Sequence, residues 1–310
     1  MKIVAVEPLG ITTADQEHYV KEWTKWDHFL KIYKDRTEDP EELIQRIGDA
    51  DILLISNIPL PKEVLEKGTQ LKMISVAFTG LDHIDLKYCQ ERGILVKNCA
   101  GYATTAVAEL AIGLMIDLYR RITPLDQEMR NGKTRNHFLG RQLKGKTVGI
   151  VGTGAIGLET ARLAQSFGCK VMAWSRSERK QAIEMGITYV TLPTLMAHSD
   201  IISLHTPLNT ETHHLIDRDL LQKCKKSAIL INTARGNIVD IEAVAQALTN
   251  GTISGAAFDV FEKEPPLSTD HPLLHTPNTI IVPHIAYATE ESFSERVDMV
   301  FQNVKEYLHL

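Results

Sequence analysis

Apolar and polar positions along the chain follow two patterns, because short β-rich runs are separated by stretches in which apolar residues recur at helical spacing. Over the first hundred residues these runs predict strands at 3–6, 29–33, 52–55, 73–76 and 94–97. Helical patterns lie between them, most clearly at 41–47 and at 61–66, where a proline stands at the start. This alternation predicts a parallel sheet with right-handed crossovers.

The alternation starts again in the second part of the chain. A helix is predicted over 104–121, because Thr104 or Thr105 can cap it and apolar residues follow at helical spacing. Strands are then predicted at 147–151, 171–174, 189–191, 201–204, 229–232, 255–258 and 279–282. Residues 290–310 return to a helical pattern, although periodicity does not show where that helix packs.

Composition agrees with a two-domain globular protein. The 310 residues are too many for most single cores, and 44% hydrophobic with 24% charged residues is ordinary for a folded soluble chain. A formal net charge of −5 provides no excess of Lys and Arg for a phosphate backbone or an anionic bilayer. We therefore expect neither nucleic acid nor membrane as a partner.

Cysteine usage and the N-terminal segment bear on the cellular compartment. The four cysteines are widely spaced and form no Cys-x-x-Cys pair, so we expect reduced thiols and no metal site. Residues 1–6 are apolar only briefly before Glu7 and Pro8, and the apolar stretch 106–116 contains Glu109. Neither segment is typical of a signal peptide or a membrane span, and a cytoplasmic protein is expected.

The segment 152–157 (GTGAIG) carries a Gly-x-Gly-x-x-Gly pattern between a predicted strand and a predicted helix. The three glycines permit a tight turn, a close approach of backbone to a pyrophosphate, and packing of helix on strand. The amide groups at the helix start then face the anion. Such glycines also make ordinary turns, but in this context they predict a dinucleotide site.

The strand at 171–174 ends where NAD-binding units usually offer a carboxylate to the ribose 2′-hydroxyl. Ser175 and Arg176 stand there instead, and both side chains can donate hydrogen bonds to a 2′-phosphate. NADP(H) is therefore favoured, with NAD(H) as the alternative cofactor. The competing interpretation is that Arg176 is a solvated surface residue and that the protein accepts both cofactors.

Three further segments lie at predicted strand ends, where open α/β sheets place their ligands: 232–236 (NTARG), 259–265 (DVFEKEP) and 283–286 (PHIA). They contain an arginine, carboxylates and a histidine. An arginine can grip a carboxylate through two parallel N–H groups, and a histidine can transfer a proton near neutral pH. A neighbouring carboxylate can orient the histidine, so the set suits reduction of a 2-oxo acid.

At these segments the sequence resembles the D-isomer-specific 2-hydroxyacid dehydrogenases, and the match includes 145–150 (GKTVGI) ahead of the glycine loop. The resemblance runs nearly end to end, and its pattern is most similar to that of glyoxylate and hydroxypyruvate reductases. It implies Arg235 as the substrate anchor, Glu264 as the partner of the histidine and His284 as the acid–base group. Asp259 would then lie near the nicotinamide.

The resemblance assigns two further segments. In 78–85 (FTGLDHID), Thr79 and Gly80 match backbone positions that receive the substrate carboxylate; a plain glycine turn before a helix capped by Asp82 is compatible with that role. Segment 102–109 resembles the hinge helix beside the nicotinamide. The implied cofactor contacts are Thr105, Gly152, Gly154, Ala155, Ile156, Gly157, Ser175, Arg176, Thr206, Pro207, Thr233, Ala234, Arg235, Asp259, His284 and Ala286.

The implied fold consists of two doubly wound, Rossmann-like parallel-sheet domains, one flavodoxin-like and one NAD(P)-binding, with a cleft between them. Residues 1–100 and 287–310 would form the substrate domain, and residues 101–286 the nucleotide domain. The helix from Thr104 resembles the family's dimer contact, so a homodimer is expected.

The resemblance implies an NAD(P)-dependent oxidoreductase acting on CH–OH donors, and it leaves the acid open. Relatives that act on phosphoglycerate usually carry an arginine after the strand at 52–55, whereas 56–60 here reads SNIPL. Small unphosphorylated acids such as glyoxylate and hydroxypyruvate fit better. The alternatives are a dehydrogenase for D-lactate, D-glycerate, phosphoglycerate or a branched-chain acid, and a cofactor-sensing, corepressor-like binding protein.

Overall fold

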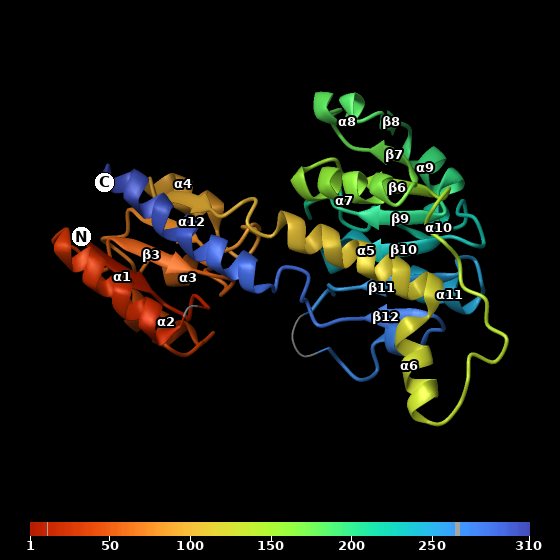
Figure 1. The fold of residues 1–310 in the computed structure, drawn as a ribbon. Coiled ribbons are helices and arrows are strands. Elements are labelled where there is room, and N and C mark those ends of the chain that lie inside the picture. The colour runs from red at the N-terminus through yellow and green to blue at the C-terminus, as the bar shows by residue number, and fades with distance from the viewer. Residues whose placement is uncertain (11, 264–266) are drawn as a thin grey trace. The chain divides into compact units, whose positions relative to one another are not determined.

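A computed structural model describes residues 1–10, 12–263 and 267–310 of the chain. The chain forms two compact units, each built around its own sheet (Figure 1). Unit 1 contains Met1–Ala103 and Ala288–Leu310, and unit 2 contains Thr104–Tyr287. These divisions fall after Ala103 and Tyr287, and those expected from the sequence fall after 100 and 286.

Unit 1 contains a five-stranded parallel sheet in the order β2-β1-β3-β4-β5. This is the flavodoxin-like strand order. The central strands β3 and β4 are buried at every position, which explains why β3 is apolar throughout and β4 is apolar except at Ser75. The strands are β1 (Lys2–Ala5), β2 (Phe29–Ile32), β3 (Ile52–Ile55), β4 (Met73–Val76) and β5 (Leu95–Asn98). The helices are α1 (Thr13–Lys25), α2 (Pro40–Ile47), α3 (Lys62–Leu65), α4 (Leu86–Arg92) and α12 (Glu290–Leu308).

The C-terminal helix α12 returns to unit 1, and this supplies the packing that periodicity could not show. It lies against β4 and β5, and Val300 and Phe301 on its inner face are buried. The Ser75 hydroxyl of β4 donates to the Val300 carbonyl oxygen at 2.9 Å. A capping box formed by Thr289 and Ser292 fixes the start of the helix.

Unit 2 contains a seven-stranded parallel sheet in the order β12-β11-β10-β9-β6-β7-β8. Strand order reverses between β6 and β9, as in the Rossmann fold. The strands are β6 (Thr147–Val151), β7 (Lys170–Trp174), β8 (Thr188–Tyr189), β9 (Ile201–Leu204), β10 (Ile229–Asn232), β11 (Gly255–Phe258) and β12 (Thr279–Ile281). The helices are α5 (Thr104–Arg120), α6 (Ile122–Arg130), α7 (Ala155–Ser166), α8 (Lys180–Glu184), α9 (Leu192–His198), α10 (Arg218–Leu221) and α11 (Ile241–Thr249), with 3₁₀ turns η1 (Gly236–Ile238) and η2 (Pro272–His275).

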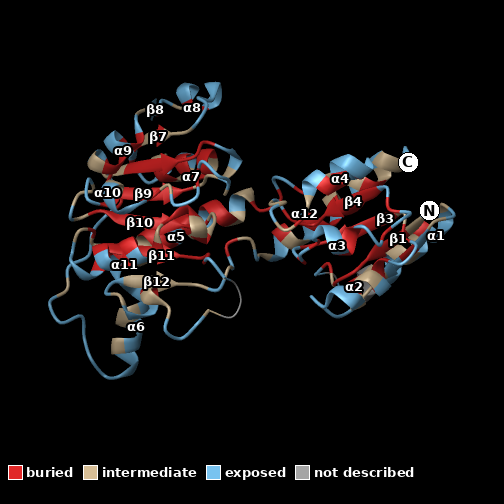
Figure 2. Ribbon diagram, turned by 180° about the vertical axis from the view of Figure 1, so that it is seen from behind, coloured by how far each residue is buried: buried red, intermediate tan, exposed pale blue. Residues whose placement is uncertain are grey.

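Both faces of the unit 2 sheet are covered by apolar side chains, and the central strands are buried throughout (Figure 2). Successive residues of one strand enter opposite layers: Ile229 and Ile231 pack with α5 and α7, whereas Leu230 packs with α9 and α11. The fold is therefore doubly wound, as predicted.

Several helix ends differ from the predictions. Helix α5 begins at Thr104 itself, so neither Thr104 nor Thr105 is the residue that precedes and caps it. Helix α4 is capped by Asp85 and not by Asp82, because the turn after Gly80 extends three residues further before the helix starts. Thr191 lies outside β8 and caps α9 by accepting the N–H of Thr194. None of the helices in the described part of the chain is long and apolar enough to span a membrane.

Candidate active site

The glycine-rich loop joins β6 to α7 at the point where the strand order of unit 2 reverses. Gly152 has a φ of +101°, and a Cβ there would lie 2.6 Å from the carbonyl oxygen of His205. A Cβ on Gly157 would lie 2.0 Å from the Gly152 carbonyl oxygen. These two positions therefore require glycine for the protein's own packing.

Gly154 is different because a Cβ added there meets no described atom within 4 Å. It is the N-cap residue of α7 and has an extended backbone, which any residue could adopt. The amide groups of the first helical turn, from Ala155 onward, have no partner within the helix. The glycine thus leaves open space directly in front of free N–H donors, as an approaching phosphate requires.

The loop is held by the Tyr189 side chain from β8 and by the backbone of the residue that follows β9. The Tyr189 hydroxyl of β8 donates to Thr153 Oγ1 at 2.8 Å and accepts the Arg179 N–H at 2.9 Å. On the other side, the His205 N–H donates to the Val151 carbonyl oxygen, and His205 Nε2 lies 2.8 Å from Ser203 Oγ. Burial lowers the pKa of His205 to about 3, so this imidazole is neutral at physiological pH.

Ser175 and Arg176 follow β7, where the ribose of a dinucleotide would lie. Ser175 is half-buried and Arg176 is exposed. Arg176 Nη1 lies 3.4 Å from Glu211 Oε2, and both side chains are mostly in solvent. A pair of this kind contributes little, so the guanidinium can exchange it for a phosphate at small cost.

The turn after β10 is shaped by the buried side chain of Asn232. Its Oδ1 accepts the Ala234 N–H at 3.1 Å, and its Nδ2 donates to the Arg235 carbonyl oxygen at 3.0 Å. A Cβ on Gly236 would lie 2.0 Å from the Phe261 carbonyl carbon. The turn that contains Arg235 therefore packs closely against the segment that follows β11. Thr233 Oγ1 in this turn is buried and has no hydrogen-bond partner among the described residues.

His284 lies just after β12, in a backbone conformation that few non-glycine residues adopt. Its φ is +51°, a strained value for a side chain that branches at Cγ into a ring. The fully buried Asp259 carboxylate accepts the next two amide groups, from Ile285 at 2.7 Å and from Ala286 at 2.9 Å. The imidazole ring meets Tyr287 edge to face, with centroids 5.4 Å apart. Asp259 therefore fixes the loop that presents the histidine.

Thr79 and Gly80 belong to unit 1 and follow β4. The Thr79 carbonyl oxygen accepts the side-chain amide of Asn98 at 2.7 Å. The turn then continues to the Leu60–Ile84 bridge, in which the Leu60 N–H donates to the His83 carbonyl oxygen at 2.8 Å. The loop is thus attached at both ends to its neighbouring strands.

Comparison with known proteins decides the family. Residues 112–286 match the family model described as D-isomer specific 2-hydroxyacid dehydrogenase, NAD binding domain. The chain is 42% identical over 280 residues to a glyoxylate reductase from Thermofilum pendens, with 87% of this chain and 82% of that protein covered. The chain belongs to the D-isomer specific 2-hydroxyacid dehydrogenase family. It is therefore an NAD(P)-dependent oxidoreductase that acts on CH–OH donors.

Two further similarities fit this family. A hydroxypyruvate reductase from Blautia hydrogenotrophica is 35% identical over 286 residues, which cover 89% of this chain and 88% of that protein. Among solved structures, an acyclic imino acid reductase (Bsp5) in complex with NADPH and D-Arg has a TM-score of 0.89 at 30% identity, with 100% of this chain and 97% of that chain covered.

Observations within unit 2 indicate that the residues of this dehydrogenase fit a nicotinamide dinucleotide. Open space stands before the N-terminus of α7 at Gly154, and the buried Thr233 hydroxyl lacks a partner among the described residues. Thr206 and Pro207 extend from β9, and Ala286 is buried beside Asp259. Within the described ranges no group of three or more His, Cys, Asp or Glu side chains could hold a metal ion.

The predicted catalytic residues lie in unit 2, and the predicted substrate-binding residues Thr79 and Gly80 lie in unit 1. Arg235, Asp259 and His284 follow β10, β11 and β12, which are adjacent in the unit 2 sheet. Glu264 lies outside the described residues. Glu262 is engaged by His271, with Nε2 and Oε2 3.2 Å apart.

Two residues that shape the site, Tyr189 and Asn232, had no role predicted from the sequence. Asn232 carried a signal, since an asparagine directly after a buried apolar run is typical of a side chain that closes its own turn. Tyr189 carried none, because its partner Thr153 lies 36 residues away and is brought near only by the sheet order.

Proposed function

We propose that this dehydrogenase is an NADP(H)-preferring reductase that converts small, unphosphorylated 2-oxo acids of the glyoxylate and hydroxypyruvate type to D-2-hydroxy acids. The observation that carries the proposal is the alignment of Arg235, Asp259 and His284 at the ends of three adjacent strands, downstream of a glycine loop with room for a pyrophosphate. The names of the similar glyoxylate and hydroxypyruvate reductases support the substrate class.

In the proposed mechanism each residue of the chain has one task. The N–H groups of Thr79 and Gly80 and the guanidinium of Arg235 bind the substrate carboxylate, and Arg235 also polarises the 2-oxo group. His284, with Glu264 as its proposed partner, donates a proton to the oxygen, and its neutral imidazole accepts that proton in the reverse direction. Bound cofactor supplies the hydride for C2 of the substrate.

The preference for NADP(H) rests on the end of β7. Among the described residues, the exposed Arg176 guanidinium has only a long ion pair with Glu211, and Ser175 adds a hydroxyl donor beside it. Neither side chain repels a 2′-phosphate, whereas a carboxylate at this point would. The structurally similar imino acid reductase was solved with NADPH, which agrees with this preference.

The preference for an unphosphorylated substrate rests on charge at the loop after β3. Arg36 contacts this loop through Asn57, and its guanidinium donates to Glu7, Glu38 and Asn57 at 2.8, 2.6 and 2.6 Å. Two carboxylates therefore offset one guanidinium. Arg36 therefore offers little net positive charge to a phosphate on the substrate.

A homodimer is part of the proposal. Helix α6 has no buried residue, and Ile122, Met129 and Leu139 around it expose large apolar side chains. Coverage of this surface by a second copy would remove that apolar area from water. Light scattering during gel filtration should give twice the chain mass; a single-chain mass at micromolar concentration would reject the dimer.

The experiment that tests the proposal is a panel of 2-oxo acids assayed with NADPH and with NADH. We expect the highest kcat/KM for glyoxylate or hydroxypyruvate with NADPH, and values at least about tenfold lower for 3-phosphohydroxypyruvate. A preference for the phosphorylated acid would reject the substrate class. Cofactor binding without turnover of any acid would favour a sensor.

A further inference from the structure

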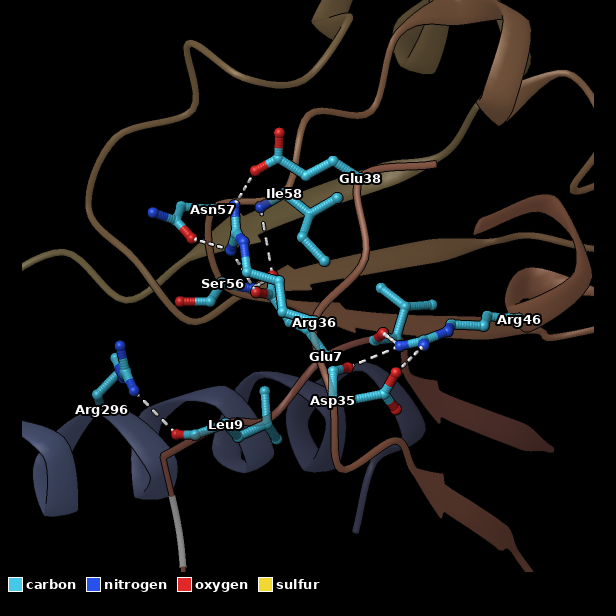
Figure 3. A network of polar contacts seen from close by, with 11 residues as sticks. Glu7, Leu9, Asp35, Arg36, Glu38, Arg46, Ser56, Asn57, Ile58 and Arg296 are labelled. Atoms are coloured by element: carbon cyan, nitrogen blue, oxygen red, sulfur yellow. Dashed lines mark hydrogen bonds and ion pairs between the residues drawn. The ribbon is translucent and has the colours of Figure 1, made fainter. Parts of the chain in front are cut away.

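Glu7 is a buried carboxylate that links three segments of unit 1. It lies two residues beyond β1, and its side chain is 4% exposed. Glu7 Oε1 accepts the N–H groups of Ser56 and Ile58 at 2.7 and 3.3 Å, and Oε2 accepts Arg36 Nη1 at 2.8 Å (Figure 3). One carboxylate thus joins the ends of β1 and β3 to the segment after β2.

Arg36 contacts the same segment, residues 56–58, through the side chain of Asn57. Besides Glu7, its guanidinium donates to Asn57 Oδ1 at 2.6 Å and to Glu38 at 2.6 Å (Figure 3). Residues 56–58 are therefore fixed at two backbone amides and at one side-chain amide. Charge-assisted bonds of this length are among the stronger polar contacts in proteins.

The fixed segment continues to Leu60, which is hydrogen-bonded to the end of the loop that we assign to the substrate carboxylate. Two residues after Ile58, the Leu60 N–H donates to the His83 carbonyl oxygen at 2.8 Å, and the Leu60 carbonyl oxygen accepts the Asp85 N–H at 3.2 Å. His83 follows Gly80 by three residues. Backbone hydrogen bonds of Leu60 thereby connect the segment that contains residues 56–58 to residues 83–85, at the end of the turn that begins at Thr79 and Gly80.

An ionised carboxylate is energetically unfavourable at the buried position of Glu7. Burial raises the pKa of Glu7, even though the Ser56 N–H and the Arg36 charge act in the opposite direction. Ionised buried groups are weak evidence of stabilisation, since apolar side chains of similar volume often do as well. The presence of a carboxylate at Glu7 is better explained by its effect on the geometry of the loop than by a contribution to stability.

We propose that Glu7 and Arg36 are positioning residues that set the geometry of the carboxylate-binding loop at Thr79 and Gly80. This proposal rests on the proposed role of that loop in substrate binding. The pair acts through the β3–α3 segment and does not touch substrate, so its effect should fall on the KM for the 2-oxo acid. Cofactor affinity, which belongs to unit 2, should not change.

Three variants distinguish a positioning role of Glu7 and Arg36 from a general effect on protein stability. Glu7→Ala removes both acceptor atoms; Glu7→Gln keeps an oxygen for the Ser56 N–H but loses the charge that Arg36 faces. Asp35→Asn is the matched control, because Asp35 Oδ2 pairs with Arg46 at 2.7 Å in the same network and does not contact residues 56–58 (Figure 3). All three are compared by thermal unfolding before any assay.

The kinetic readout is the split between KM and kcat on hydroxypyruvate. We expect the KM to rise about tenfold in Glu7→Ala and about threefold in Glu7→Gln, with kcat within twofold of wild type and the Kd for NADPH unchanged. Asp35→Asn should match wild type. An unchanged KM in folded Glu7→Ala, or parallel changes in all three constants, would overturn the proposal.

A second readout does not depend on turnover. Amide hydrogen exchange should become faster in residues 56–60 and 77–85 of both Glu7 variants and stay unchanged in unit 2. Unchanged exchange at 77–85 would overturn the proposal even if the KM rose. If wild type reduced no 2-oxo acid, the proposed function would fail, and the exchange pattern would still decide whether Glu7 positions the loop.

Discussion

At the scale of single residues, the site is held by side chains that bind backbone. The Asp259 carboxylate accepts the two amides that follow His284, and this offsets the strain of a histidine with φ of +51°. Asn232 does the same for the turn that presents Arg235. Both side chains are buried at strand ends, so the groups that would contact substrate are fixed before it binds.

Asp259→Asn tests this arrangement. An amide places an NH2 donor where one of the two carboxylate oxygens now accepts, so either the Ile285 or the Ala286 N–H faces a donor in place of its acceptor. We expect kcat on hydroxypyruvate to fall by about 10–100-fold, because the histidine is displaced. Stopped-flow and steady-state rates would measure the loss.

The matched control is Asp200→Asn. Asp200 also accepts a backbone amide, from Thr147 at 2.9 Å, and it pairs with Lys225, but it lies at the opposite edge of the sheet, before β9. This variant should lower the unfolding temperature and leave kcat near wild type. Equal kcat in Asp259→Asn and wild type would mean that Asp259 does not position His284.

Arg176 provides the residue-scale test of cofactor choice. Arg176→Ala should raise the KM for NADPH about tenfold, since a charge-assisted hydrogen bond to a phosphate is lost, and should leave the KM for NADH unchanged. Arg162→Ala removes the same charge from an exposed pair with Glu159 on α7 and should change neither constant. An equal rise for both cofactors would show that Arg176 does not recognise the 2′-phosphate.

At the scale of elements, the glycine loop separates a packing requirement from a binding requirement. Gly157 is needed where α7 approaches β6, because any Cβ would meet the Gly152 carbonyl oxygen. No contact within the described part of the chain requires glycine at Gly154, since a Cβ added there would enter open space. The two glycines of one motif therefore predict opposite phenotypes.

Gly157→Ala should lower the free energy of unfolding by about 1–3 kcal/mol through overpacking. Gly154→Ala should change it by less than about 0.5 kcal/mol but weaken NADPH binding at least tenfold, because the methyl group occupies space needed by the pyrophosphate. Urea unfolding and fluorescence titration measure the two quantities. NADPH binding by Gly154→Ala as tight as by wild type would contradict the assignment of this space to the cofactor.

The elements themselves were largely predictable from sequence, and the reason is burial on both faces. Strands such as β3 and β9 are apolar at nearly every position, which makes them visible as unbroken runs. Helices α1 and α6 were not singled out; in α6 the apolar residues Ile122, Leu125 and Met129 recur at helical spacing, although the helix buries none of its residues. Sheet order and side-chain contacts such as Tyr189 with Thr153 depend on tertiary packing, which spacing does not encode.

At the scale of the whole molecule, the chain leaves unit 1 at Ala103 and returns to it at Ala288. Unit 2 is therefore continuous, whereas unit 1 needs the C-terminal helix. Helix α12 contributes four fully or nearly fully buried apolar side chains to unit 1: Val297, Val300, Phe301 and Val304. Each is worth about 1.5–3 kcal/mol when buried, and their sum is comparable to the stability of a domain.

Dissection of the chain tests this organisation. We expect the fragment Thr104–Tyr287 to unfold cooperatively and to bind NADPH, and the fragment Met1–Ala103 to remain unfolded by circular dichroism. Joining Met1–Ala103 to Ala288–Leu310 through a flexible linker should restore a folded unit 1. Cooperative folding of Met1–Ala103 alone would show that α12 is dispensable.

The most direct test of the account is the fate of a labelled hydride. NADPH carrying deuterium at the transferred C4 position is incubated with hydroxypyruvate and the enzyme, and the product is analysed by mass spectrometry and chiral chromatography. We expect D-glycerate with one deuterium at C2, formed at a rate that falls sharply in His284→Ala. Unlabelled product, the L-enantiomer, or an undiminished rate in His284→Ala would contradict it.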